Sequence, residues 1–107
     1  MFLVGVLLNV TKTTRAIAME YYHRLSETER QDFEEFSDIE IFFCLLVIAL
    51  KYDQDCAPTM GSAIKIFNTY APMAYEDLEL DRMLSLEVTI LQALDWDVYY
   101  AYQNDDD

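Results

Sequence analysis

The longest apolar run of the chain, IFFCLLVIAL at residues 41–50, ends abruptly on Lys51. It follows SDIE at 37–40, where a serine precedes a glutamate by three residues, which is the pattern of a capping box at a helix start. Together they predict a helix over about residues 38–52. Because its apolar side chains point in every direction around the axis, we expect it to be a buried central helix.

Helical periodicity predicts a second helix from Thr11 or Thr13 to Leu25. Within it Glu20 and Arg24 stand four residues apart, an order that favours an ion pair on the helix surface. The apolar stripe that should face the core consists of Ile17, Ala18, Tyr21, Tyr22 and Leu25.

Two more helices are expected after the loop CAPTMGS, a short one over about 62–68 and a longer one over about 75–94. The long helix has an apolar stripe, but Glu87 falls about 40° from Met83 at ~100° per residue, at the centre of that face. A carboxylate in such a place must be paired or hydrogen-bonded. The stripe consists of Leu80, Met83, Leu84, Leu86, Ile90, Leu91 and Leu94.

The remaining segments carry weaker signals. Residues 2–9 are apolar and predict a short first core helix; the alternative, a signal or anchor, lacks a basic leading region and the roughly 20 apolar residues of a membrane span. The acidic stretch 26–37 predicts an exposed connection, with Phe33 and Phe36 turned toward the body of the protein.

Composition and net charge indicate the fold class and argue against some kinds of partner. The 107 residues include 53% hydrophobic residues and only two glycines and two prolines, so we expect one all-α domain over residues 1–107 with an acidic tail at 103–107. The net charge of −13 argues against nucleic acid as a partner. Cys44 and Cys56 form no metal pattern and predict reduced thiols in an intracellular protein, with a disulfide as the minor alternative.

Nothing in the sequence predicts an enzyme. His23 is the only histidine, and no serine or cysteine has a spacing that suggests a triad, so no catalytic residue is expected. The acidic clusters at 53–55 and 105–107 lack the spacing of a calcium loop, and we expect no metal, cofactor or small-molecule ligand.

Lys51 and Glu87 are the two charges that a purely apolar core would not include. One interpretation is structural: they pair where their helices meet, and the lysine also interacts favourably with the helix dipole. The other is functional: the pair marks a seam between two helices where a protein partner docks, with each charge bonding backbone groups of the incoming chain.

Three segments resemble the cyclin box, the five-helix kinase-binding module of cyclins, over roughly residues 11–98. LLVIALKYDQD is similar to the third helix of that family and its end, LSLEVTILQALDWDV to the fifth helix and its exit, and TTRAIAMEYYHRLS to the second helix. The resemblance implies a cyclin-like bundle of about five helices around a central one, here with a shortened first helix. The LDW ending and the single box are similar to single-box cyclins of the phosphate-signalling and protist groups.

The resemblance implies a function for the two charges. Lys51 and Glu87 occupy the positions of the paired charges that hydrogen-bond the kinase in cyclins. The same motifs place Ile48, Leu91, Trp96 and Val98 around a small apolar pocket that receives a side chain from the kinase. The expected function is a regulatory subunit that binds and activates a cyclin-dependent serine/threonine kinase, in the nucleus or cytoplasm and away from membranes. The alternatives are a cyclin-fold scaffold that binds without activating, and a transcription-factor-type cyclin fold.

Overall fold

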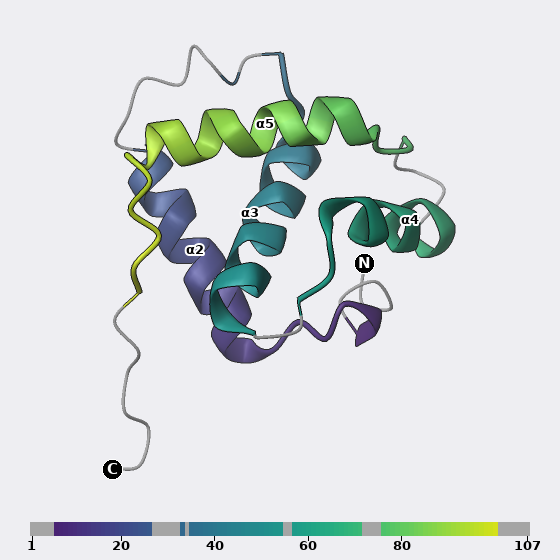
Figure 1. Cartoon of the computed structure of the whole chain (residues 1–107), viewed down its shortest axis with the longest axis horizontal. Coiled ribbons are helices and arrows are strands. Elements are labelled where there is room, and N and C mark those ends of the chain that lie inside the picture. The colour runs from purple at the N-terminus through teal and green to yellow at the C-terminus, as the bar shows by residue number, and fades with distance from the viewer. Residues whose placement is uncertain (1–5, 27–32, 34, 55–56, 72–75, 101–107) are drawn as a thin grey trace.

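The computed structural model describes residues 6–26, 33, 35–54, 57–71 and 76–100. In these residues the protein is all-α, as the sequence predicts, and no strand is present (Figure 1). The helices are α2 (Lys12–Ser26), α3 (Asp38–Asp53), α4 (Met60–Tyr70) and α5 (Leu80–Ala93).

Helix α3 is the centre of the fold. Figure 1 shows α5 crossing α3, with α2 and α4 on its two sides. Every residue from Phe43 to Leu50 is buried, which confirms the predicted central helix. The rings of Phe43 and Phe67 meet edge to face, with centroids 5.1 Å apart, and join α3 to α4.

The start of α3 is fixed by its own residues and by α5. The capping box is present: Ser37 Oγ accepts from the Glu40 amide, and Glu40 Oε1 accepts from the Ser37 amide. Arg82 of α5 then donates from Nε to Glu40 Oε2 at 2.7 Å and from Nη2 to the Glu35 carbonyl, while its guanidinium lies 4.5 Å from the centre of the Phe36 ring. The capping glutamate therefore serves two helices at once.

The first turn of α2 lies next to the last turn of α3 in space. Thr11 Oγ1 accepts from the Thr14 amide, and the buried Thr14 hydroxyl donates to Asp53 Oδ2 at 3.1 Å, which ties the two helix ends together. The predicted pair of Glu20 and Arg24 is present at 3.4 Å. Most of the predicted stripe of α2 is buried; its exception, Tyr22, is 36% exposed.

Helix α5 begins at Leu80, several residues later than predicted. The Asn68 side chain explains why: its Oδ1 accepts from the Leu78 amide at 2.7 Å, and its Nδ2 donates to the Leu78 carbonyl at 3.0 Å. Both backbone groups of Leu78 are thus satisfied outside a helix. Helix α4 is longer than predicted, because Thr59 caps it by accepting from the Ser62 amide.

The apolar stripe of α5 is wider than the core it was expected to fill. Met83, Leu86, Ile90 and Leu94 are buried, but Leu80 and Leu84 are 43% and 40% exposed, so the prediction of core positions was wrong for these two. Successive residues of a helix are turned by about 100°. Glu87 therefore lies between the buried row and the exposed row, not at the centre of the core face.

The weaker predictions are met in part. Phe33 and Phe36 are buried, whereas residues 27–32 and 34 of the predicted connection lie outside the described residues. So do residues 2–5 of the predicted first helix, Cys56 and the tail at 103–107; residues 6 and 7 are helical. Among the described helices, none has both the length and the apolar composition that crossing a bilayer requires.

Candidate functional site

Lys51 and Glu87 form an ion pair between the last turn of α3 and the middle of α5. Lys51 Nζ lies 2.8 Å from Glu87 Oε2, and the two side chains are 42% and 15% exposed. Burial of Cys44 nearby raises the pKa of its thiol well above the ordinary value, and the negative charge of Glu87 raises it further against the opposing effect of Lys51. The buried Cys44 thiol therefore stays neutral, and of the two charged side chains the lysine is the more exposed to solvent.

An apolar hollow lies beside this pair. It has a volume of about 440 Å³ and is lined by Ile48, Lys51, Tyr52, Glu87, Leu91 and Val98. Five of the six residues that the sequence indicated as a docking site thus come together from α3, α5 and the segment after α5. The sequence analysis missed Tyr52, although it is four residues from Ile48 and therefore on the same helix face.

Trp96 is the sixth indicated residue, and it does not line the hollow. Its side chain is 61% exposed, and its amide donates to the Leu91 carbonyl at 2.8 Å, so its backbone adjoins a residue of the hollow. Both Asp95 and Trp96 have left-handed backbone angles, with φ of 57° and 59°. This turn redirects the chain after α5, and the Trp96 side chain remains mostly exposed to solvent.

The surface around the pair is apolar. Leu80, Leu84 and Val88 follow one another at intervals of four along α5 and are 40% to 46% exposed. With Trp96 and the hollow, they give α5 an outward apolar face bordered by the Lys51–Glu87 pair. Exposed apolar surface edged by polar groups is typical of a protein interaction site.

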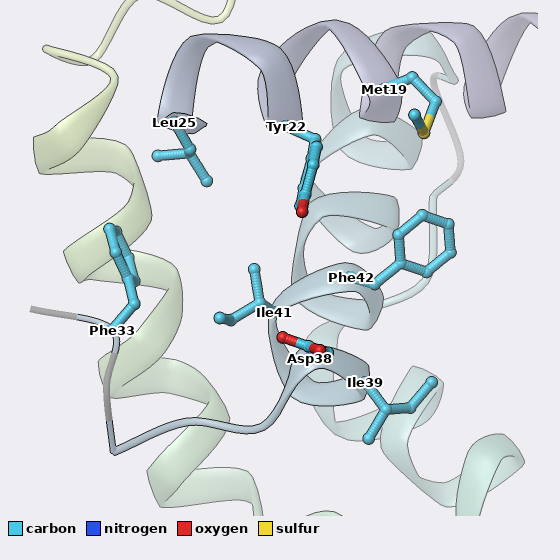
Figure 2. A pocket seen from close by; sticks show the side chains of 8 residues that line it. All are labelled: Met19, Tyr22, Leu25, Phe33, Asp38, Ile39, Ile41 and Phe42. Carbon is cyan, nitrogen blue, oxygen red and sulfur yellow. The ribbon is translucent and has the colours of Figure 1, made fainter. Parts of the chain in front are cut away.

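A second hollow lies at the other end of α3, between that helix and α2 (Figure 2). Its volume is about 480 Å³, and it was not indicated by the sequence analysis. In Figure 2, Tyr22 points from α2 toward Ile41 of α3, and the Asp38 carboxylate is the charged group of the wall. The other lining residues are Met19, Leu25, Phe33, Ile39 and Phe42.

The first hollow combines apolar side chains with two charged groups at its edge. An ammonium group has three donor hydrogens and a carboxylate two acceptor oxygens, so the contact between them leaves further bonding capacity at the rim. An incoming backbone can use that capacity while an apolar side chain fills the hollow. Across the described parts of the chain, no three histidine, cysteine or acidic side chains converge as a metal site would require.

Comparison with known proteins agrees with this arrangement of helices. The profile of the family described as "Cyclin, N-terminal domain" matches residues 1–99. No curated protein and no solved structure gives a significant match to the chain. The family match covers nearly the whole sequence, including all four described helices. The chain belongs to the cyclin family, whose N-terminal domain is a regulatory and non-catalytic helical bundle.

Proposed function

We propose that this cyclin-family chain binds a cyclin-dependent serine/threonine kinase and shifts it toward its active conformation. The observation that supports the proposal most directly is the Lys51–Glu87 pair at the rim of an apolar hollow, with the lysine accessible and the glutamate mostly buried. The side chains lining that hollow offer an anchoring site for one apolar side chain, and the paired charges offer bonds to the backbone next to it. A kinase partner requires an intracellular location, nuclear or cytoplasmic.

Activation would follow from binding one kinase conformation in preference to another. Phosphoryl transfer in protein kinases requires a lysine–glutamate pair that includes a glutamate of the kinase C-helix, and the position of that helix decides whether the pair forms. A surface that fits the C-helix only in its inward position shifts the kinase population toward activity. The chain itself supplies no catalytic group, cofactor or metal in this proposal.

The experiment is a binding and activity assay with purified components. The full chain is titrated against a panel of purified cyclin-dependent kinases by calorimetry, and phosphorylation of a peptide substrate is measured with and without the chain. We expect a micromolar or tighter complex with at least one kinase and a higher rate of phosphorylation in that complex. Binding without a rate increase would establish the scaffold alternative, and binding to none of the kinases would overturn the proposal.

The transcription-factor alternative is tested separately. The net charge of −13 repels phosphate, so we propose that the chain does not bind nucleic acid. Titration of fluorescent duplex DNA at physiological salt should give no saturable change. A saturable signal would favour the DNA-binding alternative.

A further inference from the structure

After α5, the four consecutive backbone carbonyls of residues 97–100 accept hydrogen bonds from side chains of α2 and α3. We name residues 97–100 the C-terminal strap. Arg24 donates from Nη1 to the Asp97 carbonyl at 3.0 Å and from Nη2 to the Tyr99 carbonyl at 2.6 Å. Between these two, the Val98 carbonyl accepts from the hydroxyl of Tyr21 at 2.7 Å. In Figure 1 this yellow segment runs beside α2.

The last carbonyl of the strap is bonded from α3. The Tyr52 hydroxyl accepts from the Tyr100 amide at 3.1 Å and lies 3.4 Å from the Tyr100 carbonyl. The strap belongs to no helix or strand, so its backbone gains order from these side chains and not from a ladder of its own. Val98 and Tyr100 also pack against the hydrophobic core, and the bonds from Arg24 are ones that a single substitution removes.

The turn before the strap has an unfavourable backbone conformation, which the contacts around it must stabilise. Asp95 and Trp96 are consecutive residues in the left-handed region, which is unfavourable for a bulky side chain such as that of Trp96. Such a conformation persists only where the surrounding structure imposes it. Part of that constraint comes from backbone bonds within the turn, in which the Asp95 amide donates to the Gln92 carbonyl at 3.0 Å and the Trp96 amide to the Leu91 carbonyl at 2.8 Å. The downstream anchor at Arg24 adds to it by holding two of the carbonyls that follow the turn.

An arginine suits this anchor better than a lysine. The two accepting carbonyls are two residues apart, and the planar guanidinium presents separate donors to both. The guanidinium carbon also lies 5.7 Å from the centre of the Tyr21 ring, so the two fastening residues of α2 hold each other in place. A single ammonium group would reach one carbonyl with less directional control.

The strap forms part of the hollow beside the Lys51–Glu87 pair, which we name the docking hollow. Val98 lines it, whereas Arg24 and Tyr21 do not. We propose that Arg24 is a positioning residue of the docking hollow, which holds Val98 and the Trp96 turn in the geometry that a partner helix requires. This inference rests on the proposed function for its consequence in binding, but the state of the strap is measurable without a partner.

The first experiment tests the anchor in the free chain. Trp96 is the only tryptophan, so its fluorescence anisotropy reports on the turn directly. In Arg24→Gln we expect lower anisotropy and amide exchange at Tyr100 that is about tenfold faster, while exchange in the buried part of α3 stays unchanged. Glu20→Gln is the matched control, because it removes the helix-surface partner of Arg24 but keeps both strap bonds.

The control should behave as the wild type, and Arg24→Lys should recover part of the loss. Unchanged exchange and anisotropy in Arg24→Gln would overturn the inference. A general rise in exchange over α3 would do so as well, because it would assign Arg24 to overall stability and not to the strap.

The second experiment tests the link to docking by a double-mutant cycle. Kinase binding is measured for Arg24→Gln, Val98→Ala and the double variant. We expect about tenfold weaker binding for each single variant and little further loss in the double one, because Arg24 acts through the strap that carries Val98. Independent, multiplying losses would overturn the positioning role. If the wild type binds no kinase, the proposed function fails, whereas the exchange measurements still decide whether Arg24 anchors the strap.

Discussion

Lys51 and Glu87 pair across α3 and α5 with unequal exposure: 42% of the lysine side chain is accessible but only 15% of the glutamate side chain. An ion pair with one partner this accessible typically contributes only about 0–1 kcal/mol to folding. The pair thus contributes little to the free energy of folding, and an apolar contact at the same place would contribute about as much. This imbalance between its small structural contribution and its place beside a hollow is the physical basis of the docking proposal.

Reversing one charge should separate folding from binding. In Lys51→Glu we expect kinase affinity to fall by about a hundredfold or more, because a carboxylate cannot donate to the backbone carbonyl that the ammonium would bond and leaves that carbonyl buried without a partner. The free energy of unfolding should fall by about 1 kcal/mol, since the pair is partly solvated. Calorimetric titration and urea denaturation measure the two effects.

The charge-swapped double variant, Lys51→Glu with Glu87→Lys, is the control for this prediction. It restores an attractive pair, so stability should return toward the wild-type value while kinase binding stays weak. Recovered binding in the swap would show that the pair acts only within this fold, and the assignment of the docking site would then be wrong.

Trp96 should matter for binding and hardly at all for stability. Its side chain is 61% exposed, so Trp96→Ala removes little buried surface in the free chain. A large aromatic side chain at the centre of an interface typically contributes about 2 kcal/mol or more, which is about thirtyfold in affinity. Tyr70→Ala, an exposed aromatic on α4, should leave affinity unchanged. Equal effects of the two variants would exclude Trp96 from the interface.

Asn68 should be a stability residue with no role in docking. Asn68→Ala leaves the amide and carbonyl of Leu78 without their side-chain partners, which we expect to lower the free energy of unfolding by about 1–3 kcal/mol. Urea denaturation measures the loss. The neighbouring Thr69→Ala removes only a hydroxyl that bonds back to its own helix, and it should be close to neutral. A neutral Asn68→Ala would show that solvent replaces both bonds.

Glu40 should make the protein sensitive to acid. Burial alone would raise its pKa, but the hydrogen bond from Arg82, with smaller contributions from Ser37 and from the charge of Arg82, brings the net pKa below the ordinary value of 4.5. A carboxyl with a lowered folded-state pKa stabilises the fold above its unfolded pKa, and this stabilisation disappears as the pH falls through the folded value.

The measurement is the melting temperature of wild type and Glu40→Gln as a function of pH. We expect the variant to melt lower at pH 7 and the difference to shrink as the pH falls below about 4.5. Glu79→Gln makes the same charge change at an exposed residue near Arg82, and its difference from wild type should be smaller at every pH. A difference for Glu40→Gln that does not depend on pH would contradict the assigned ionisation.

Local pattern was sufficient to predict much of the fold. The capping box and the apolar run placed α3 almost to the residue, because both depend on neighbours within one or two helical turns. Periodicity predicted the pair of Glu20 and Arg24 for the same reason. The similarity to the cyclin box then indicated five of the six residues that line the hollow beside the Lys51–Glu87 pair.

The sequence by itself determined the all-α class, the central helix and the two unusual charges. Each of these depends on composition or on the spacing of residues within a single helix. Only the tertiary structure decided which apolar residues of α5 stay at the surface, where α5 begins, and what holds the strap. Leu84 and Ile90 look alike in a periodic pattern, but one faces solvent and the other the core. Asn68 and Arg24 act on backbone groups 10 and 73–75 residues away, and contacts over such distances exist only once the helices have packed.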